Sequence, residues 1–465
     1  MPEFLYVLTI ICVVLSYVTM GFYYFWVSFL AFFPAVQHCQ EIDYSEDMEI
    51  YFFVAIPCLN EESVIVDTVR NILKTNMKNL RVIVIDDDSQ DDTVARLMAA
   101  YEDIILPLDD NAPLGKESLN KKLFLLKRHL PDAQFGKGKS LNAAYALVSK
   151  IIAYESIKPG KCVMGIFDAD SFVSRRTFKR VAVIMDTERD VGMVQARLRI
   201  GTSTRDYFLP LFQDLEFFTF INKMQNFREY TGTVSAAGNG QFNRVSAIDP
   251  TEPWTKCLLE DYDFSLRMLL KGWRTRLLQE DWVFQQGVLT YRKLVRQRSR
   301  WCQGGLQCIF FWNDIKNSRY LSAWGKVESL FFMLLPFFTL LAVFSQIISA
   351  GIIAYYYWLN KSIIIPLMSP FSTTELEEVL VVMSMFVFVP GLIYSWFHYR
   401  DTKENWLVCL LTGIFWPIYN LMQIPAVLKA VWRQMTRQTS WIKTQHLEEK
   451  KSRKPGFWRK RQAEA

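Results

Sequence analysis

Long uncharged stretches lie at both ends of the chain, on either side of a polar central region. They contain no Asp, Glu, Lys or Arg and comprise Phe4 to Gln37, Ser329 to Asn360, Val379 to Phe397 and Trp406 to Leu428. Each is longer than the roughly 18 apolar residues that a helix needs to cross a bilayer core. We therefore predict a membrane anchor at residues 1–47 and a transmembrane region of about three segments at 321–435.

The central region, residues 48–320, alternates short β-rich runs with helical stretches. The expected strands are Ile50 to Ile56, Leu80 to Ile85 and Cys162 to Phe167, and the expected helices are Glu61 to Leu73, Asp91 to Tyr101 and Lys139 to Tyr154. This alternation predicts an α/β domain with a mostly parallel sheet wrapped by helices. In such sheets, ligands bind beyond the carboxyl ends of the strands. We predict an insertion or flexible excursion over Asp109 to Phe135.

The net charge of +6 is concentrated beside the apolar stretches, in Arg292 to Arg300 and in the tail. Basic residues next to membrane spans favour the cytoplasmic side. We expect a cytosolic central domain, interfacial helices near 207–228 and 290–315, and a basic cytosolic or interfacial tail at 436–465. Nucleic-acid binding is the alternative explanation, but no basic stripe forms a recognisable reader module. The eight cysteines form no CxxC pair, which suits a reducing compartment.

Acidic residues follow two of the predicted strands. Asp86 and Asp87 end one apolar run, and Asp168 and Asp170 follow another. Two carboxylates on one side of an extended segment suit a divalent cation that also binds a diphosphate, although such acids also occur simply as surface charge. A carboxylate at a strand end also accepts the imide N–H of uracil. Lys139 begins a predicted helix, where it either approaches phosphate groups or is an ordinary basic helix terminus.

Two further motifs lie downstream. Glu260 and Asp261 open a helical pattern. Acids there complement the helix dipole, but an adjacent pair exceeds that need, and one of them suits the role of proton acceptor for an attacking hydroxyl. Gln297, Arg300 and Trp301 lie in the motif Gln-Arg-Ser-Arg-Trp. An indole face stacks on a sugar and a guanidinium holds a diphosphate, whereas an amphipathic interfacial helix is the alternative.

The order Asp-Asp, Asp-x-Asp, Glu-Asp and Gln-x-x-Arg-Trp resembles that of the family 2 glycosyltransferases that are integral membrane polysaccharide synthases, such as cellulose, chitin, hyaluronan and poly-N-acetylglucosamine synthases. By motif, the resemblance covers about residues 50 to 310. It implies a cytosolic GT-A-like domain inserted between transmembrane helices of the plasma membrane. It also implies processive, inverting transfer from a UDP-sugar, with UDP-glucose or UDP-N-acetylglucosamine favoured, to a growing polysaccharide that leaves through the spans.

The resemblance also implies roles for individual residues. Asp87 matches the acid that contacts uracil, and Asp168 and Asp170 match the ligands of Mg²⁺ or Mn²⁺ on the diphosphate. The implied nucleotide-sugar site comprises Pro57, Leu59, Glu61, Asp87, Lys139, Asp168 and Asp170. Two positions depart from the family pattern, because Asp88 stands where Gly is frequent and Leu59 where an aromatic residue often faces the base.

Asp261, beside Glu260, matches the general base that deprotonates the acceptor hydroxyl. Gln297, Arg300 and Trp301 match the motif that lines the acceptor and the diphosphate. An accessory membrane or regulatory subunit is a further partner that the resemblance allows.

Two other functions remain open. The first is transfer of one sugar to a membrane lipid phosphate, by enzymes that share the donor-binding acids but normally lack Gln-x-x-Arg-Trp. The second is an inactive membrane scaffold or export subunit, which the intact acidic motifs disfavour. Three spans after the central domain place the basic tail outside, against its charge, so one stretch is expected to be re-entrant, namely Trp406 to Trp432 with Pro417 and Pro425 inside it.

Overall fold

The computed structural model describes residues 25–38, 43–110, 121–201, 208–358 and 388–438, together with isolated positions between 7 and 22 and at 113 and 115. Residues 1–24 of the predicted N-terminal anchor, apart from isolated positions, lie outside the described residues, as do the start of the apolar stretch Val379 to Phe397 and the tail from residue 439 onward. The boundaries of the four predicted regions stay predictions.

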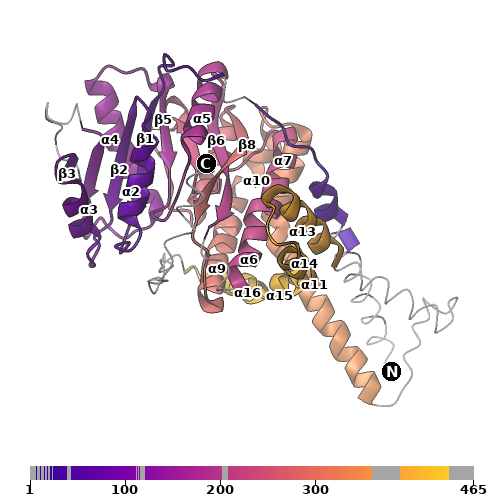
Figure 1. Ribbon diagram of the computed structural model, residues 1–465. Coiled ribbons are helices and arrows are strands. Elements are labelled where there is room, and N and C mark those ends of the chain that lie inside the picture. Colours follow the sequence, from indigo (N-terminus) through magenta and orange to yellow (C-terminus); the bar gives the residue numbers. More distant parts are fainter. Residues whose placement is uncertain are drawn as a thin grey trace.

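In the described part of the chain, eight strands form one sheet in the spatial order β3-β4-β2-β1-β5-β7-β6-β8 (Figure 1). β7 runs antiparallel to β5 and β6, and the other neighbouring pairs are parallel. The carboxyl ends of β1, β2, β4 and β5 therefore meet at one edge, where β7 begins. The strands are β1 Tyr51–Cys58, β2 Leu80–Asp86, β3 Ile105–Asp109, β4 Leu123–Lys127, β5 Cys162–Ile166, β6 Val191–Ile200, β7 Gln241–Arg244 and β8 Arg274–Gln285.

The predicted α/β class is confirmed, and β1, β2 and β5 nearly coincide with the expected runs. The insertion or flexible excursion predicted over Asp109 to Phe135 was wrong, because β4 lies inside it and pairs with β2 and β3. The first four residues of β4, Leu-Phe-Leu-Leu, are all buried. A strand covered on both faces appears in sequence as a short continuous apolar run, without the alternation that identifies a half-exposed strand.

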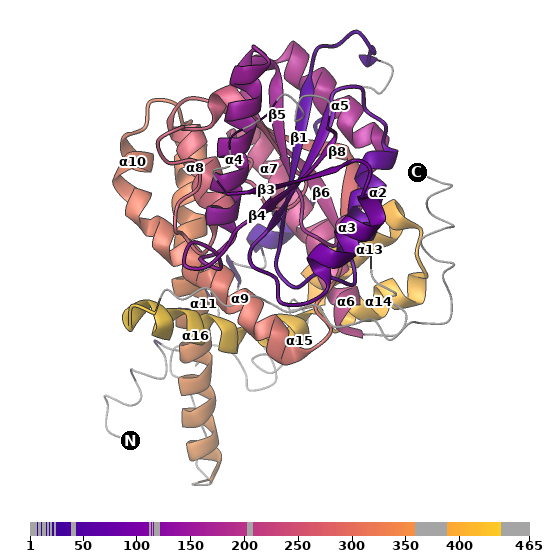
Figure 2. The same cartoon turned by 90° about the vertical axis from the view of Figure 1, so that its left-hand side faces the viewer.

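Helices cover both faces of the sheet (Figures 1 and 2). One core cluster includes Ile65, Leu97 and Phe178 from the helices of one face, and another includes Val148 and Phe264 from those of the other. Burial of each such side chain stabilises the fold by about 1.5–3 kcal/mol. The sheet whose strand ends carry the acidic residues is therefore stabilised by packing on both faces. The helices of the first face are α2 Ile65–Lys74, α3 Thr93–Tyr101 and α5 Arg175–Thr187, and those of the second are α4 Lys137–Tyr154 and α8 Glu260–Leu270.

A further group of helices packs beside β6 and β8. A continuous helix runs from α6 through a π-helical stretch, η5, into α7, and a separate apolar cluster joins it to α9, α13 and α15. Figure 2 shows α16 and α9 lying side by side beneath the sheet. The helices are α6 Phe208–Asp214, η5 Leu215–Ile221, α7 Asn222–Thr231, α9 Tyr291–Gln307, α10 Trp312–Asn317, α13 Val389–Thr402, α14 Trp406–Ile414, α15 Trp416–Leu421 and α16 Ile424–Met435.

The longest helix, α11 (Ala323–Trp358), projects from the body of the molecule (Figures 1 and 2). Its 36 residues correspond to a length of about 54 Å at 1.5 Å per residue. The Glu328 carboxylate accepts hydrogen bonds from Arg228 Nε at 2.7 Å and from Thr233 Oγ1 at 3.0 Å. This buried ion pair anchors the first turns of α11 on α7.

Among the residues that the structure describes, we find no single helix both long and apolar enough to cross a bilayer. The helices Trp406–Ile414 and Trp416–Met435 together have a suitable length and composition, but they are bent by 51°. The bend lies within the stretch expected to be re-entrant. The transmembrane arrangement inferred from the sequence thus stays a prediction.

Candidate active site

Asp86 and Asp87 lie at the carboxyl end of β2, as predicted. Both are buried, and burial raises the pKa of each carboxyl group. Arg128, the residue after β4, donates to Asp87 Oδ1 and opposes this shift at Asp87. Asp87 Oδ2 accepts from the backbone N–H of Gln134 at 3.0 Å. Asp87 is therefore held in place by several donors, which also include the Ser140 side chain.

The predicted base-binding residues lie at the end of β1, which contains Pro57, and on the loop that follows it, next to Asp87. The backbone N–H of Asp87 donates to the Cys58 carbonyl at 3.0 Å, which places Pro57 and Leu59 beside it, both half-buried. Glu61 is buried, and its backbone N–H donates to Thr93 Oγ1 at 2.8 Å. The structure thus brings the three predicted residues and Asp87 together.

Two further hydrogen bonds connect the loop after β1 to the loop after β2. Ser89 Oγ accepts from Asn60 N at 2.9 Å, and Asn60 Oδ1 accepts from Gln90 N at 2.8 Å. Asp88, in the loop after β2, has a φ of +69°. Gly adopts this left-handed conformation without strain and Asp tolerates it better than most residues, which explains the departure from the family pattern at Asp88.

Asp168 and Asp170 lie at the same edge, after β5, but in different environments. Asp170 is 5% exposed, and its Oδ2 accepts from the backbone N–H of Gln286 at 2.8 Å. The Asp168 side chain is 43% exposed and pairs with Lys137 Nζ at 2.5 Å. Asp168 is therefore the more accessible member of the pair.

Lys137 joins Asp168 to the loop that precedes β7. Its Nζ donates to Asp168 Oδ1 and to the Gly238 carbonyl, both at 2.5 Å. Burial alone lowers the pKa of Lys137, but Asp168 and then Glu260 outweigh it and the pKa is raised. Lys139 is exposed in the first turn of the same helix, and its predicted phosphate contact stays a prediction.

Asp261 faces the same loop. A Cβ on Gly238 would lie 2.8 Å from Asp261 Oδ2, and Gly238 has a φ of +72°, so this position favours glycine on both counts. Burial and then the neighbouring Glu260 raise the pKa of Asp261 to about 7, against the opposing effects of Lys137 and Arg300. A carboxylate with a pKa near neutrality is well suited to accept a proton.

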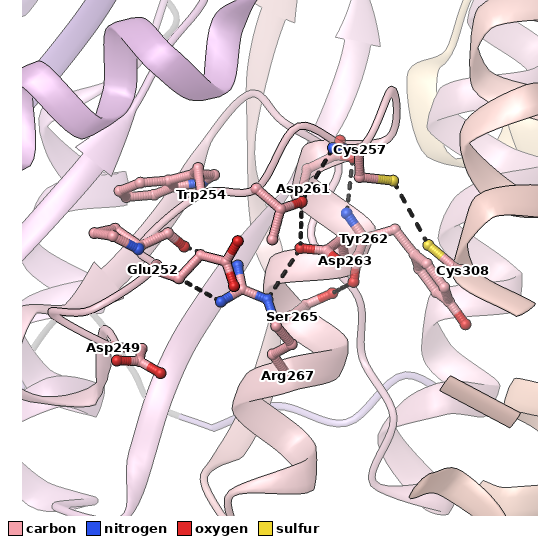
Figure 3. Close-up of polar contacts among 12 residues, drawn as sticks. Asp249, Glu252, Trp254, Cys257, Asp261, Tyr262, Asp263, Ser265, Arg267 and Cys308 are labelled. Carbon is pink, nitrogen blue, oxygen red and sulfur yellow. Dashed lines mark hydrogen bonds and ion pairs between the residues drawn. The ribbon is translucent and has the colours of Figure 1, made fainter. Parts of the chain in front are cut away.

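The start of α8 is drawn in Figure 3. Asp263 accepts from Thr255 Oγ1 at 3.1 Å and from Arg267 Nε at 3.0 Å. Arg267 also donates to the Glu252 carbonyl at 2.6 Å. Asp263 therefore stabilises α8 and the loop before it, whereas Asp261, with its neighbour Glu260, remains for chemistry.

Helix α9 packs directly on the start of α8. Gly304 contacts the backbone nitrogen of Leu259 so closely that a Cβ would overlap it. The Sγ atoms of Cys257 and Cys308 lie 3.9 Å apart at the same junction (Figure 3). Arg300 Nη1 lies 4.0 Å from Glu260 Oε2. The predicted catalytic pair and the Arg of the Gln-x-x-Arg-Trp motif are thus brought together.

The remaining motif residues lie on the same helix, partly buried. The Trp301 ring centroid lies 4.4 Å from Arg298 Cζ, and the edge-on Phe217 ring lies 5.9 Å away. Gln297 Oε1 is buried and has no hydrogen-bond partner within the described chain. Buried acceptors are usually paired. A hydroxyl group of a bound ligand is a candidate for the missing partner of Gln297 Oε1.

The residues fit a divalent cation only in part. Within the described ranges, no group of three or more His, Cys, Asp or Glu side chains could hold a metal. Mg²⁺ is commonly bound by one or two carboxylates together with substrate phosphates and water. Asp168 and Asp170 suit that mode, with the diphosphate supplying the other oxygen ligands.

Sequence reasoning missed three residues of this site: Arg128, Lys137 and Gly238. Arg128 follows a strand that was not predicted, and Lys137 is the first lysine of Gly-Lys-Gly-Lys, where the second was chosen. Gly238 lies in Gly-Asn-Gly just before β7, a pattern that signals a turn but not a contact with Asp261.

A protein-family model described as glycosyltransferase like family 2 matches residues 50–304, more than half of the chain. The chain belongs to this family. The fold of this chain is similar to that of a solved structure, the mannosyltransferase PcManGT from Pyrobaculum calidifontis in complex with GDP-Man and Mn²⁺. The likeness has a TM-score of 0.56 at 15% sequence identity, over 92% of this chain and 99% of that chain. At this identity it supports the GT-A-like fold.

Curated relatives of this family 2 member differ in what they make. A beta-monoglucosyldiacylglycerol synthase of Trichormus variabilis is 30% identical over 271 residues, 57% of this chain and 51% of the relative. A poly-beta-1,6-N-acetyl-D-glucosamine synthase of Staphylococcus aureus is 25% identical over 285 residues, 60% of each chain. The match spans about half the length of the first relative. The first relative, a glucosyl-lipid synthase, favours transfer of a single sugar to a lipid over polymer synthesis, although the Gln-x-x-Arg-Trp motif favours the polymer. Its name specifies diacylglycerol and not the lipid phosphate expected from the sequence.

Proposed function

We propose that this protein transfers a single sugar from a nucleotide sugar to the hydroxyl group of a membrane lipid of the diacylglycerol type. The observation that carries the proposal is the half-buried Asp261, with a pKa of about 7, which faces the Gly238 loop at the sheet edge that also bears Asp168. A lipid acceptor is supported by the 30% identity to a glucosyldiacylglycerol synthase. It is supported further by the apolar helices that pack beside α9.

In the proposed reaction, Asp261 accepts the proton of the acceptor hydroxyl as its oxygen attacks the anomeric carbon of the donor. The bond between that carbon and the diphosphate oxygen breaks, and the nucleoside diphosphate leaves with the electron pair. Attack opposite the leaving group inverts the anomeric centre. The proton remains on Asp261 until it passes to water.

The donor is proposed to lie across the carboxyl edge of the sheet. Asp87 accepts a base N–H, and UDP-glucose or UDP-N-acetylglucosamine is the favoured donor. Lys137 and Arg300 supply positive charge beside the diphosphate. Asp168 and Asp170 would hold Mg²⁺ or Mn²⁺, which neutralises charge on a departing diphosphate.

We further propose that the helices beside α9 contact the cytosolic surface of the plasma membrane. Large apolar side chains are exposed along α14 to α16, with Trp406 63%, Trp432 65% and Met435 75% exposed. Soluble proteins rarely leave a continuous apolar surface of this kind uncovered. The acceptor would then reach Trp301 from the bilayer, along α9.

The test is a transfer assay with the purified full chain in liposomes that contain diacylglycerol. Radiolabelled UDP-glucose, UDP-N-acetylglucosamine and GDP-mannose are supplied with Mg²⁺ or Mn²⁺. We expect a chloroform-soluble product with one sugar per lipid, formed from one of the UDP-sugars. Label that appears only in a high-molecular-weight, water-soluble product would refute the lipid acceptor.

Polymer synthesis is the second candidate. It is favoured by the Gln-x-x-Arg-Trp motif and by the 25% identity to a poly-N-acetylglucosamine synthase. In the same assay it predicts a product whose length grows with time and that linkage-specific hydrolases degrade.

A further inference from the structure

Glu216 is a buried acid in a helix to which the sequence pattern gave no chemical role. It lies in the π-helical stretch η5 and is 8% exposed. π-helical turns are uncommon and frequently occur at functional sites, because the extra residue reorients the side chains around it. The π-helical stretch therefore sets the direction in which the Glu216 carboxylate points.

Two partners from different helices share one oxygen of this carboxylate. Glu216 Oε2 accepts from Arg298 Nη2 at 2.6 Å and from the Tyr419 hydroxyl at 2.5 Å. Tyr419 lies on α15 and stacks on Phe212 of α6 at 5.2 Å. Hydrogen bonds to an ionised acceptor are about twice as strong as neutral ones, and all three groups are buried.

Arg298 transmits this constraint to the Gln-x-x-Arg-Trp motif. Its guanidinium carbon lies 4.4 Å from the Trp301 ring centroid and 5.2 Å from that of Phe217. A guanidinium placed over an indole face restricts the orientation of that ring. Trp301 is thus supported on one face by a group whose own position depends on Glu216.

We propose that Glu216 is a positioning residue for the acceptor site, acting through Arg298 on Trp301, with Tyr419 linking the same carboxylate to α15. This inference rests on the proposed function, in which Trp301 lines the acceptor. Glu216 touches neither donor nor acceptor. Its loss should weaken the use of the acceptor and leave the use of the donor unchanged.

The kinetic test uses Glu216→Gln, which keeps the size of the side chain but removes its charge. Loss of one charge-assisted contact predicts a rise of about tenfold or more in the acceptor KM. The donor KM and the slow hydrolysis of donor by water should change by less than about twofold, because neither requires Trp301. Tyr419→Phe should give a smaller effect in the same direction. Equal rises in the donor KM and the acceptor KM of Glu216→Gln would overturn the proposal.

Asp281→Asn is the matched control. Asp281 is also a buried partner of an arginine, Arg180, at 2.7 Å, but it lies on β8 away from α9. We expect this variant to lose thermal stability with an unchanged acceptor KM. A rise in its acceptor KM equal to that of Glu216→Gln would show a general effect of destabilisation.

A spectroscopic test does not depend on which acceptor is used. The protein is labelled with 5-fluorotryptophan and observed by ¹⁹F NMR. The Trp301 resonance is the one that is absent from the spectrum of Trp301→Phe. Glu216→Gln should shift or broaden this resonance, and Asp281→Asn should not. An unmoved Trp301 resonance would refute the positioning role. Absence of lipid glycosylation by the wild-type chain, with a shifted resonance in Glu216→Gln, would refute the proposed function alone.

Discussion

At the scale of residues, the site depends on the balance of charge around Asp261. Burial and Glu260 favour the protonated carboxyl group, whereas Lys137 and Arg300 favour the carboxylate. Gly238 contributes by having no side chain, so that Asp261 approaches its backbone closely. The resulting pKa of about 7 allows the carboxylate to be present at neutral pH and yet to accept a proton.

The first prediction concerns the pH dependence of transfer. The rate should rise about tenfold per pH unit below the pKa of Asp261 and level off above it, because only the ionised form accepts a proton. Asp261→Asn should abolish transfer while calorimetry shows nucleotide binding retained. Residual transfer with an unchanged pH profile in this variant would show that another group is the base.

The second prediction concerns stability at the same residue. Its pKa is 3.8 ordinarily and about 7 in the folded chain. The folded state therefore holds a proton that the unfolded chain releases, and stability is lost as pH rises from about 4 to about 7. At pH 8, the melting temperature of Asp261→Asn should exceed that of the wild type, and the difference should shrink towards pH 4. A difference that grew on acidification would contradict the raised pKa.

The third prediction compares two lysines of one helix turn. Lys137 contacts Asp168 and the Gly238 carbonyl, whereas Lys139 is exposed. Lys137→Ala should lower the transfer rate by about tenfold or more, since it removes a charge-assisted contact. Lys139→Ala tests the phosphate contact predicted from sequence. A larger loss in Lys139→Ala than in Lys137→Ala, measured at saturating donor, would reverse our assignment.

At the scale of elements, the decisive contact is that between α8 and α9. Each carries one predicted motif, and the two helices meet where Gly304 contacts the backbone of Leu259. Leu259 directly precedes Glu260, so the position of α9 also determines the position of the proposed base. The sequence shows a Gly-Gly pair in α9 but not which of the two is required.

The fourth prediction separates these two glycines. A Cβ on Gly304 would overlap Leu259, whereas Gly305 has no atom within 4 Å of its Cβ position. Gly304→Ala should destabilise the protein by about 1–3 kcal/mol and lower the transfer rate. Gly305→Ala should be neutral or stabilise by up to about 1 kcal/mol, because alanine favours the helix. Urea unfolding of both variants measures the difference, and equal effects would contradict the contact.

At the scale of the whole molecule, the sheet edge and the apolar helices lie on opposite sides of α9. Figure 2 shows α11 projecting below the body and α16 lying across its base. Trp406 on α14 and Trp432 on α16 are exposed. Both helices lie below the sheet in Figure 2. Under the proposed function, this arrangement would bring a soluble donor and a lipid acceptor to the two ends of one site.

The fifth prediction tests this orientation. In liposomes with brominated lipids, fluorescence of Trp432 should be quenched, and Trp432→Phe should lower the quenchable tryptophan signal more than Trp254→Phe does. Trp254 is 2% exposed and lies beside α4, far from the apolar surface. Equal loss in both variants would show that α16 does not contact lipid.

The sequence alone determined the α/β class, the strand-end acids and the family, because apolar periodicity and motif order are local properties of the chain. It did not identify β4, since a strand buried on both faces lacks alternation, and Arg128 was missed with it. Only the tertiary structure decided that Lys137 faces the acids, that Gly238 meets Asp261, and that Glu216 supports Trp301 through Arg298. These contacts join residues far apart in the chain, and only the packing of separate elements brings them within reach of one another.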